Sequence, residues 1–111
     1  MPLQTIDADS FVETVLRAAG PVIVLFSDAG TNRSRNMIAS LQAVACDQGA
    51  AITVVNKVFD EVGSIEQDPA YDVQSAPTTL FFKNGKLERT VVGYYAYTGI
   101  FKTWVEQLSQ V

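Results

Sequence analysis

The sequence predicts an α/β protein in which helices cover both faces of a mixed β-sheet. Apolar runs of strand length alternate with segments whose apolar residues recur at helical spacing. The dipeptide Asn84-Gly85 separates the last two predicted strands and is typical of a tight antiparallel hairpin. Strands separated by a helix pair in parallel instead. Together these signals predict a mixed central sheet of about five strands flanked by about four helices.

Length and composition narrow the class of protein. The 111 residues are enough to bury a core, and we expect one domain over residues 1–111. Hydrophobic residues make up 48% and charged residues 18%, as in globular chains. The net charge of -4 argues against nonspecific binding to nucleic acid or to anionic membranes. No apolar run reaches the roughly 18 residues of a membrane span, and residues 1–5 lack the features of a secretion signal, so we expect a cytoplasmic protein.

The first three elements are predicted from apolar patterns and flanking signals. Residues 3–6 are short and apolar enough for an edge strand. A helix follows up to Gly20-Pro21, which stops it. This helix has three candidate N-terminal caps: Asp7, Asp9 and Ser10. Residues 21–26 are continuously apolar, which is typical of a central strand covered on both faces.

The middle of the chain predicts a helix, a strand and a short helix. Residues 34–48 carry one apolar helical face, and Gly49 ends the helix. Residues 51–59 are rich in β-branched side chains and indicate another buried strand. A short helix over 64–67 is expected to break at Asp68-Pro69.

The last part predicts the hairpin and a final helix. Residues 78–82 and 87–92 form the two hairpin strands on either side of the Asn-Gly turn. Residues 98–109 form a helix with four inward-facing side chains: Phe101, Trp104, Val105 and Leu108. The predicted order of elements is therefore β-α-β-α-β-α-β-β-α.

The inventory of reactive side chains excludes several kinds of chemistry. Histidine is absent and Cys46 is the only cysteine, so Ser-His and Cys-His catalysis are excluded and zinc would lack its usual ligands. The scattered acidic residues give no convincing spacing for a hard metal. We therefore expect no metal and no cofactor. Cys46 is expected to be a small core or boundary residue, the alternatives being an intermolecular disulfide or a regulatory thiol.

Four segments carry a resemblance to a known family: PVIVLFSDAG, MIAS, SAPTTLFFKNGK and VVGYYAYTGIFKTWVEQL. They are similar to thioredoxin, and the resemblance covers nearly the whole chain. It implies a thioredoxin fold in which Pro77 is cis and lies beside the active site, followed in order by the hairpin and Gly93. The fold class expected here is therefore the thioredoxin fold.

The sequence departs from the family where thioredoxins carry a Cys-x-x-Cys motif. In that family the first thiolate, stabilised by a helix N-terminus, attacks a disulfide. Counting forward from Phe26 places the motif on 31–34, and counting back from MIAS places it on 32–35; neither stretch contains sulfur. The family's buried acid aligns with Leu25, and its lysine partner aligns with Asn56, next to Lys57. The resemblance thus implies a site that has lost its redox activity.

The turn before the second predicted helix offers hydroxyls and cations instead. Thr31 and Ser34 are expected to cap the helix, with their oxygens accepting backbone N–H groups. Arg33 and Arg35, beside Asn32, could combine with the helix N-terminus to bind phosphate, sulfate or a carboxylate. The alternative is that both arginines face solvent, partly compensated by a nearby Asp28.

Two further segments complete a candidate binding surface. In the resembled family, the residue before the proline pairs its backbone with an extended peptide, a role that falls on Ala76; a purely structural turn is the alternative. The tyrosines after Gly93 either cover the base of the hairpin or add contact area to an interface. The predicted binding residues are Thr31, Asn32, Arg33, Ser34, Arg35, Ala76, Pro77, Gly93, Tyr94 and Tyr95.

The favoured hypothesis is a thioredoxin-like protein without a redox-active dithiol. It would have no catalytic residues and would act as a binding or scaffold module for a protein or an extended, acidic peptide segment. We expect a monomer or weak dimer, with no nucleic-acid or membrane partner. The alternative is a divergent thiol-disulfide oxidoreductase that acts through Cys46 or through a partner's cysteine.

Overall fold

The central feature of the fold is a five-stranded mixed sheet. The computed structural model describes residues 4–18, 20–28, 30–60, 62–63 and 65–109. The strands are β1 (Gln4–Ile6), β2 (Pro21–Ser27), β3 (Thr53–Val58), β4 (Thr78–Lys83) and β5 (Lys86–Val92), and their order in the sheet is β1-β3-β2-β4-β5. Strands β1, β2 and β3 are parallel, whereas β4 is antiparallel to both β2 and β5. The predicted mixed α/β sheet is therefore confirmed.

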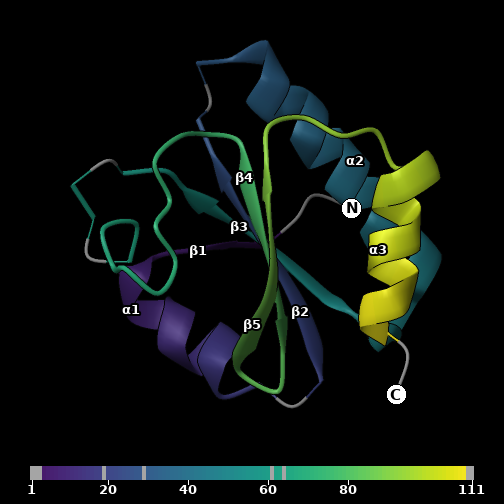
Figure 1. Cartoon of the computed structure of the whole chain (residues 1–111), viewed down its shortest axis with the longest axis horizontal. Helices are drawn as coiled ribbons and strands as arrows, with labels where there is room; N and C mark the ends of the chain where they lie inside the picture. The colour runs from purple at the N-terminus through teal and green to yellow at the C-terminus, as the bar shows by residue number, and fades with distance from the viewer. Residues whose placement is uncertain (1–3, 19, 29, 61, 64, 110–111) are drawn as a thin grey trace.

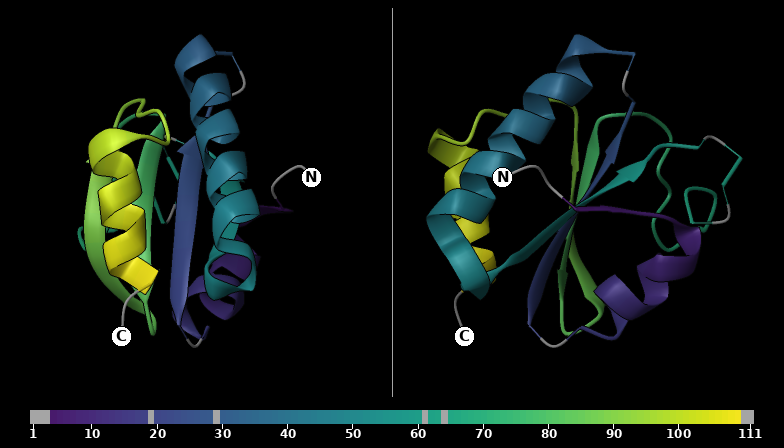
Figure 2. Two further views of the ribbon diagram at one scale, coloured as in Figure 1. Left: turned by 90° about the vertical axis from the view of Figure 1, so that its right-hand side faces the viewer. Right: turned by 180° about the vertical axis from the view of Figure 1, so that it is seen from behind.

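Helices lie on both faces of this sheet. Helix α1 (Ala8–Phe11) continues into a π-helical segment, Val12–Leu16, on the same face as the connection between β3 and β4 (Figure 1). Helices α2 (Asn32–Gln48) and α3 (Gly99–Ser109) cover the opposite face, as the view from behind shows (Figure 2). A 3-10 turn, Gly49–Ala51, links α2 to β3, so β3 begins two residues later than predicted.

The expected short helix over 64–67 is not formed in the described part of this segment. The N–H of Gln67 donates to the carbonyl of Gly63 at 3.0 Å, which closes a single helical turn. The chain then folds back, and the N–H of Val73 donates to the carbonyl of Glu66 at 3.0 Å. The described residues of this segment therefore form turns instead of a helix. Ser64 lies outside the described residues, as does Leu3 of the predicted edge strand.

Strand β2 supplies side chains to both halves of the core. Val22, Val24 and Phe26 point to the face covered by α1. Ile23 and Leu25 point to the face covered by α2 and α3. This alternation explains why the sequence of β2 is continuously apolar, because both faces are buried.

The hairpin turn adopts the conformation that its sequence predicts. Asn84 and Gly85 both have positive φ, 53° and 80°, as a type I′ turn requires. The turn also contacts the other end of the chain. The N–H of Gly20 donates to Oδ1 of Asn84 at 2.8 Å, and a Cβ on Gly85 would lie 2.3 Å from the carbonyl oxygen of Leu16. The turn is therefore packed against backbone and has no room for a side chain at residue 85.

Strand β5 lies at an edge of the sheet and contains an irregularity. Phe82 lies opposite Leu87, but Phe81 lies opposite Arg89, so Glu88 is an extra residue on β5. Such a β-bulge bends a strand and interrupts its hydrogen-bond ladder. No helix in the described part of the chain is long and apolar enough to cross a bilayer.

Candidate functional site

The sheet register brings the three predicted binding segments to one end of the sheet. Phe26 of β2 lies opposite Thr78 of β4, which lies opposite Val92 of β5. The next residues outward are therefore Pro77 and Gly93, and the N–H of Gly93 donates to the carbonyl of Pro77 at 2.8 Å. The turn that leads into α2 begins at this same end, directly after β2. We call this end the candidate face, defined by residues 31–35, 76–77 and 93–95.

Thr31 is the N-cap of α2, as predicted. Its Oγ1 accepts from the N–H of Ser34 at 3.3 Å. Its own N–H and hydroxyl both donate to the carbonyl of Asp28, each at 3.2 Å. Because the cap is at residue 31, the helix begins at Asn32, two residues before the predicted start.

Ser34 is fully buried and does not cap the helix, so the prediction of two capping hydroxyls was wrong for this residue. Its Oγ accepts from the N–H of Asp28 at 2.9 Å. This bond ties the first turn of α2 to the residue that directly follows β2. A half-buried cap at residue 31 and a buried hydroxyl at residue 34 support the 31–34 register for the missing motif. The alternative register would end on Arg35, which is exposed.

The two arginines remain exposed at the positive end of α2. The guanidinium of Arg35 donates to Oδ1 of Asn32, which fixes its direction along the helix. Oδ1 of Asp28 accepts from the N–H of Gly30 at 2.9 Å instead of pairing with a cation. Among the described residues, no carboxylate forms an ion pair with Arg33 or Arg35, so the expected compensation by Asp28 is not found. Two uncompensated guanidiniums therefore face solvent where the helix dipole is also positive.

The middle of the candidate face is the Ala76–Pro77 bond, which is cis. Pro77 is buried and Ala76 is half-buried. The hydroxyl of Thr78 donates to the carbonyl of Ser75 at 2.7 Å, across the proline. The backbone at residue 76 is thus held in a fixed direction between α2 and the end of β5.

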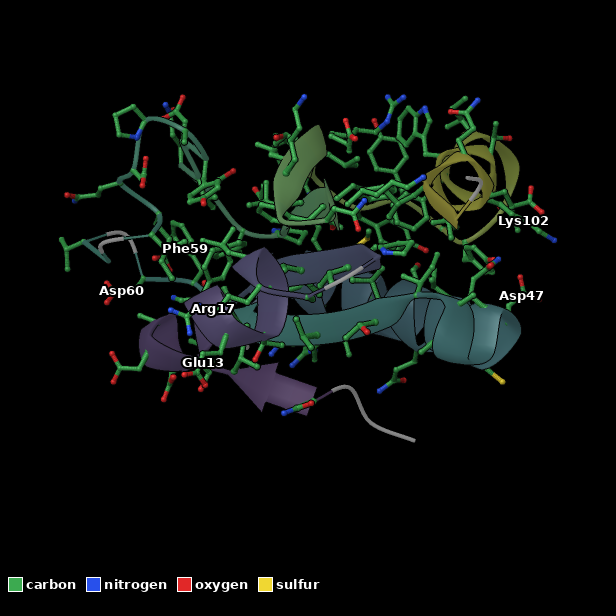
Figure 3. The ribbon with its side chains drawn as sticks, turned by 90° about the horizontal axis from the view of Figure 1, so that it is seen from below. Glu13, Arg17, Asp47, Phe59, Asp60 and Lys102 are labelled. Carbon is green, nitrogen blue, oxygen red and sulfur yellow. The ribbon has the colours of Figure 1, made fainter. Side chains whose placement is uncertain are left out.

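The three tyrosines after Gly93 have different environments. Tyr94 is 45% exposed and is available for contacts at the candidate face. The N–H of Tyr95 donates to Sδ of Met37 at 3.4 Å, and its ring stacks on Phe101 with centroids 6.2 Å apart. Tyr97 lies elsewhere, because its hydroxyl donates to Oδ2 of Asp47 at 2.5 Å, in the last turn of α2. Figure 3 shows Asp47 beside the helix that carries Lys102, away from Phe59 and Asp60.

Tyr97 gives the fold a dependence on alkaline pH. Its burial, together with the hydrogen bond to Asp47, raises the pKa of Tyr97 above its ordinary value of 10.0. The folded state holds the phenol proton of Tyr97 more tightly than the unfolded state does. The resulting contribution to stability is complete below pH 10 and is lost as pH rises through the folded pKa. We expect Tyr97→Phe to lower the free energy of unfolding by about 0.5 kcal/mol at neutral pH, because the bond is partly exposed.

The measurement is urea unfolding of wild type and Tyr97→Phe at neutral pH and above pH 10. The difference between the two proteins should shrink at alkaline pH. Burial and the nearby Asp68 also raise the pKa of Tyr71, so some alkaline destabilisation should persist in the variant. A difference that grows with pH would contradict this account.

Comparison with known proteins identifies the family. The chain is 34% identical to a thioredoxin of Rhodospirillum rubrum over 97 residues, which covers 87% of this chain and 90% of that protein. It is 33% identical to a thioredoxin of Pseudomonas aeruginosa, covering 76% of each chain. The chain belongs to the thioredoxin family. A thioredoxin of Acidithiobacillus ferridurans is also 33% identical, over 77% of each chain. No protein-family model matches the sequence.

In this thioredoxin-family chain, the positions that the resemblance gives to the buried acid and its lysine face each other. Leu25 and Asn56 lie opposite each other in β2 and β3. Neither carries a charge, and Oδ1 of Asn56 accepts from the hydroxyl of Ser27 at 2.5 Å. Both positions are therefore neutral in this chain.

A buried ion pair that the sequence reasoning missed lies close by, on the other face of the sheet. Nζ of Lys57 lies 2.6 Å from Oε2 of Glu66, and their side chains are 7% and 1% exposed. The same oxygen accepts from the N–H of Asp60 at 2.9 Å. Lys57 lies opposite Phe26 in the sheet, with its ammonium 5.5 Å from the centre of that ring. A lysine inside the apolar run of β3 was the available signal for this pair.

Cys46 is exposed, so the prediction of a core or boundary residue was wrong. The buried residues of α2 include Met37, Leu41 and Val44. Cys46 follows Val44 by two positions, which is about 200° around the helix and therefore on the solvent side. It also lies 12 residues after Ser34 in the same helix, about 18 Å along the axis. The thiol is therefore remote from the candidate face.

Proposed function

We propose that this thioredoxin-family chain is a binding or scaffold module that has lost dithiol chemistry. Its candidate face would hold an extended, acidic segment of a partner protein. As part of the same proposal, the protein works in the cytoplasm as a monomer or weak dimer, without nucleic-acid or membrane partners and without a cofactor.

One observation carries the loss of chemistry. The two hydroxyls at the motif spacing, Thr31 and Ser34, both hold the turn together through Asp28. Neither has a histidine to activate it, because the sequence contains none. The neutral pair of Leu25 and Asn56 supports the same interpretation, since a thiol-exchange site needs a group that handles protons.

The binding role is supported by what the candidate face leaves exposed. Arg33 and Arg35 carry two positive charges at a helix N-terminus, a combination that favours a carboxylate. Tyr94 offers an amphipathic ring. Ala76, between them, can pair its backbone with an extended chain, the mode known as strand addition.

The redox part of the proposal is tested by insulin reduction with dithiothreitol. Wild type should give no turnover above the reductant alone, and Cys46→Ser should behave identically. Turnover that disappears in Cys46→Ser would favour the alternative of a single-cysteine oxidoreductase. Turnover that persists in Cys46→Ser would contradict both hypotheses, because no other cysteine is present.

The binding part is tested with a library of extended peptides that differ in acidic content. Acidic peptides should shift the backbone amide NMR signals of residues 31–35 and 93–95, and Arg33→Glu/Arg35→Glu should weaken their binding about tenfold or more. The matched control is Arg17→Glu/Lys86→Glu, which makes the same change of net charge at exposed positions away from the candidate face. Equal weakening by both double variants would show that only net charge matters and would overturn the specific site.

A further inference from the structure

The bulge in β5 places two neighbouring side chains on the same face of the sheet. Leu87 packs against the core on the α1 side, whereas Phe81, which lies opposite Arg89, belongs to the core on the α2 and α3 side. In a regular strand, successive side chains point to opposite faces. Because Glu88 is an extra residue in the bulge, Glu88 and Arg89 both line one hollow on the α3 side. A carboxylate and a guanidinium on consecutive residues are thus presented to the same space.

This space, which we call the bulge hollow, lies between the hairpin and α3, which runs beside β5 (Figure 2). Its volume is about 200 Å³. Strand β4 contributes Phe81 and Lys83 to its lining, and α3 contributes Trp104 and Leu108. An engineered cavity of about 150 Å³ holds benzene, so the bulge hollow has room for one small group and not for a large cofactor. None of its lining residues belongs to the candidate face.

Arg89 is held in place but is not neutralised. Its guanidinium carbon lies 4.6 Å from the centre of the Trp104 ring, close enough for a cation–π contact. Trp104 itself packs edge-on against Tyr95, with ring centroids 5.5 Å apart. Among the described residues, no carboxylate pairs with Arg89, and its guanidinium has no hydrogen-bond acceptor. Its N–H groups are therefore positioned by Trp104 and available for a planar acceptor such as a carboxylate.

Glu88 adds a second requirement for a ligand of the bulge hollow. Its carboxylate also forms no ion pair among the described residues, while the neighbouring guanidinium lies over Trp104. It favours an N–H donor and repels a second negative charge. A matching ligand therefore carries one carboxylate with an N–H group beside it. An α-amino acid has this arrangement, because its carboxylate and its nitrogen are attached to the same carbon.

We propose that the bulge hollow binds an apolar residue that has a free α-carboxylate, as a free amino acid or at the C-terminus of a peptide. Arg89 would hold the carboxylate through paired N–H donors, and Glu88 would accept from the nitrogen. The side chain of the ligand would lie against Trp104 and the buried Leu108. This site goes beyond the proposed function and does not depend on it, since the two share no residue.

The probe is leucine, with leucinamide as the counterpart that lacks the carboxylate. Trp104 is the only tryptophan, so its indole N–H gives a single NMR signal that reports on the bulge hollow. Leucine should shift this signal and the amide signals of Glu88 and Arg89 saturably, and leucinamide should not. Glycine should bind about fivefold more weakly than leucine, because it has no side chain to cover Leu108. No saturable shift by leucine, or equal binding of leucinamide or of glycine, would each overturn the site.

Arg89→Gln should weaken leucine binding about tenfold, since it removes both the charge and the paired donors. Arg89→Lys keeps the charge without the planar fork and should retain part of the affinity. The matched control is Arg17→Gln, at an exposed arginine on the α1 side of the molecule (Figure 3), and it should bind leucine like wild type. Equal weakening by Arg89→Gln and Arg17→Gln would show that only net charge matters and would overturn the site.

N-acetyl-leucine separates the two sources of the carboxylate, because it has an N–H but no positive charge, like the end of a peptide. Tighter binding of N-acetyl-leucine than of leucine assigns the bulge hollow to a peptide C-terminus, and weaker binding assigns it to a free amino acid. Glu88→Gln should weaken leucine binding about threefold and should not weaken that of N-acetyl-leucine, whereas Glu13→Gln, at another exposed carboxylate, should change neither. Equal weakening of both ligands by Glu88→Gln would contradict the role of Glu88. None of these results depends on the binding of acidic peptides to residues 31–35.

Discussion

Replacing Lys57 with methionine is expected to lower the free energy of unfolding by about 3–5 kcal/mol, the usual loss when one partner of a buried ion pair is removed. The substitution leaves the carboxylate of Glu66 buried, with the N–H of Asp60 as its remaining donor among the described residues. Methionine fills nearly the same volume as lysine, so the loss reports on charge and not on a cavity. Urea unfolding followed by the fluorescence of Trp104 measures it.

Two further variants test whether the loss of stability comes from the buried ion pair. Lys86→Met, at an exposed lysine of β5, should change stability by less than about 0.5 kcal/mol. The double variant Lys57→Met/Glu66→Met should recover most of the loss of the single variant, because apolar residues often replace a buried pair at no cost. Oε1 of Glu66, which has no donor among the described residues, disappears in the double variant and adds to the recovery. If Lys57→Met costs no more than Lys86→Met, the pair contributes nothing to the fold.

Gly85→Ala is expected to destabilise the protein by about 2–4 kcal/mol, for two reasons that act together. Residue 85 has φ of 80°, which is unfavourable for any residue with a Cβ. The new Cβ would also lie 2.3 Å from the carbonyl oxygen of Leu16, which belongs to backbone and cannot rotate away. The hairpin turn would have to move off the π-helical segment. The same urea measurement applies.

Gly49→Ala tests the cost of backbone conformation without a contact. Gly49 also has a positive φ, 58°, at the C-terminus of α2, but a Cβ there would meet nothing within 4 Å. Its ψ of -130° lies outside the left-handed helical region, so we expect this variant to cost about 1–3 kcal/mol from backbone conformation alone. A loss of less than about 1 kcal/mol for Gly85→Ala would show that the turn can shift away from Leu16.

The sequence predicted the strands well because their signals are local. The apolar run of β2 and the Asn84-Gly85 turn depend on neighbouring residues alone, and both were confirmed. The expected helix over 64–67 failed for a reason that is not local. This segment wraps around the buried side chain of Glu66, which is held by Lys57 and by the N–H of Asp60, and that packing outweighs a weak helical preference.

The candidate site was predictable in outline and less so in detail. The sheet register brings together segments that lie up to 64 positions apart in the sequence (Thr31 to Tyr95), and the family resemblance was the only signal for that grouping. The bond between Tyr97 and Asp47 and the pair of Lys57 and Glu66 depend on how side chains reach across loops, which periodicity does not encode. Exposure of Cys46 was within reach of the sequence, because its helical angle relative to Val44 already points away from the sheet.

The extra residue in β5 bears on how the protein behaves at high concentration. A regular outer strand offers a template on which another chain can add and from which fibres can grow. At the bulge, the backbone N–H and C=O groups around Glu88 do not match the regular spacing of a straight neighbouring strand. The side chain of Glu88 also places a negative charge there. The bulge therefore interrupts the growth of an intermolecular sheet along β5. Deleting Glu88 would make β5 regular, and we expect that variant to aggregate at high protein concentration.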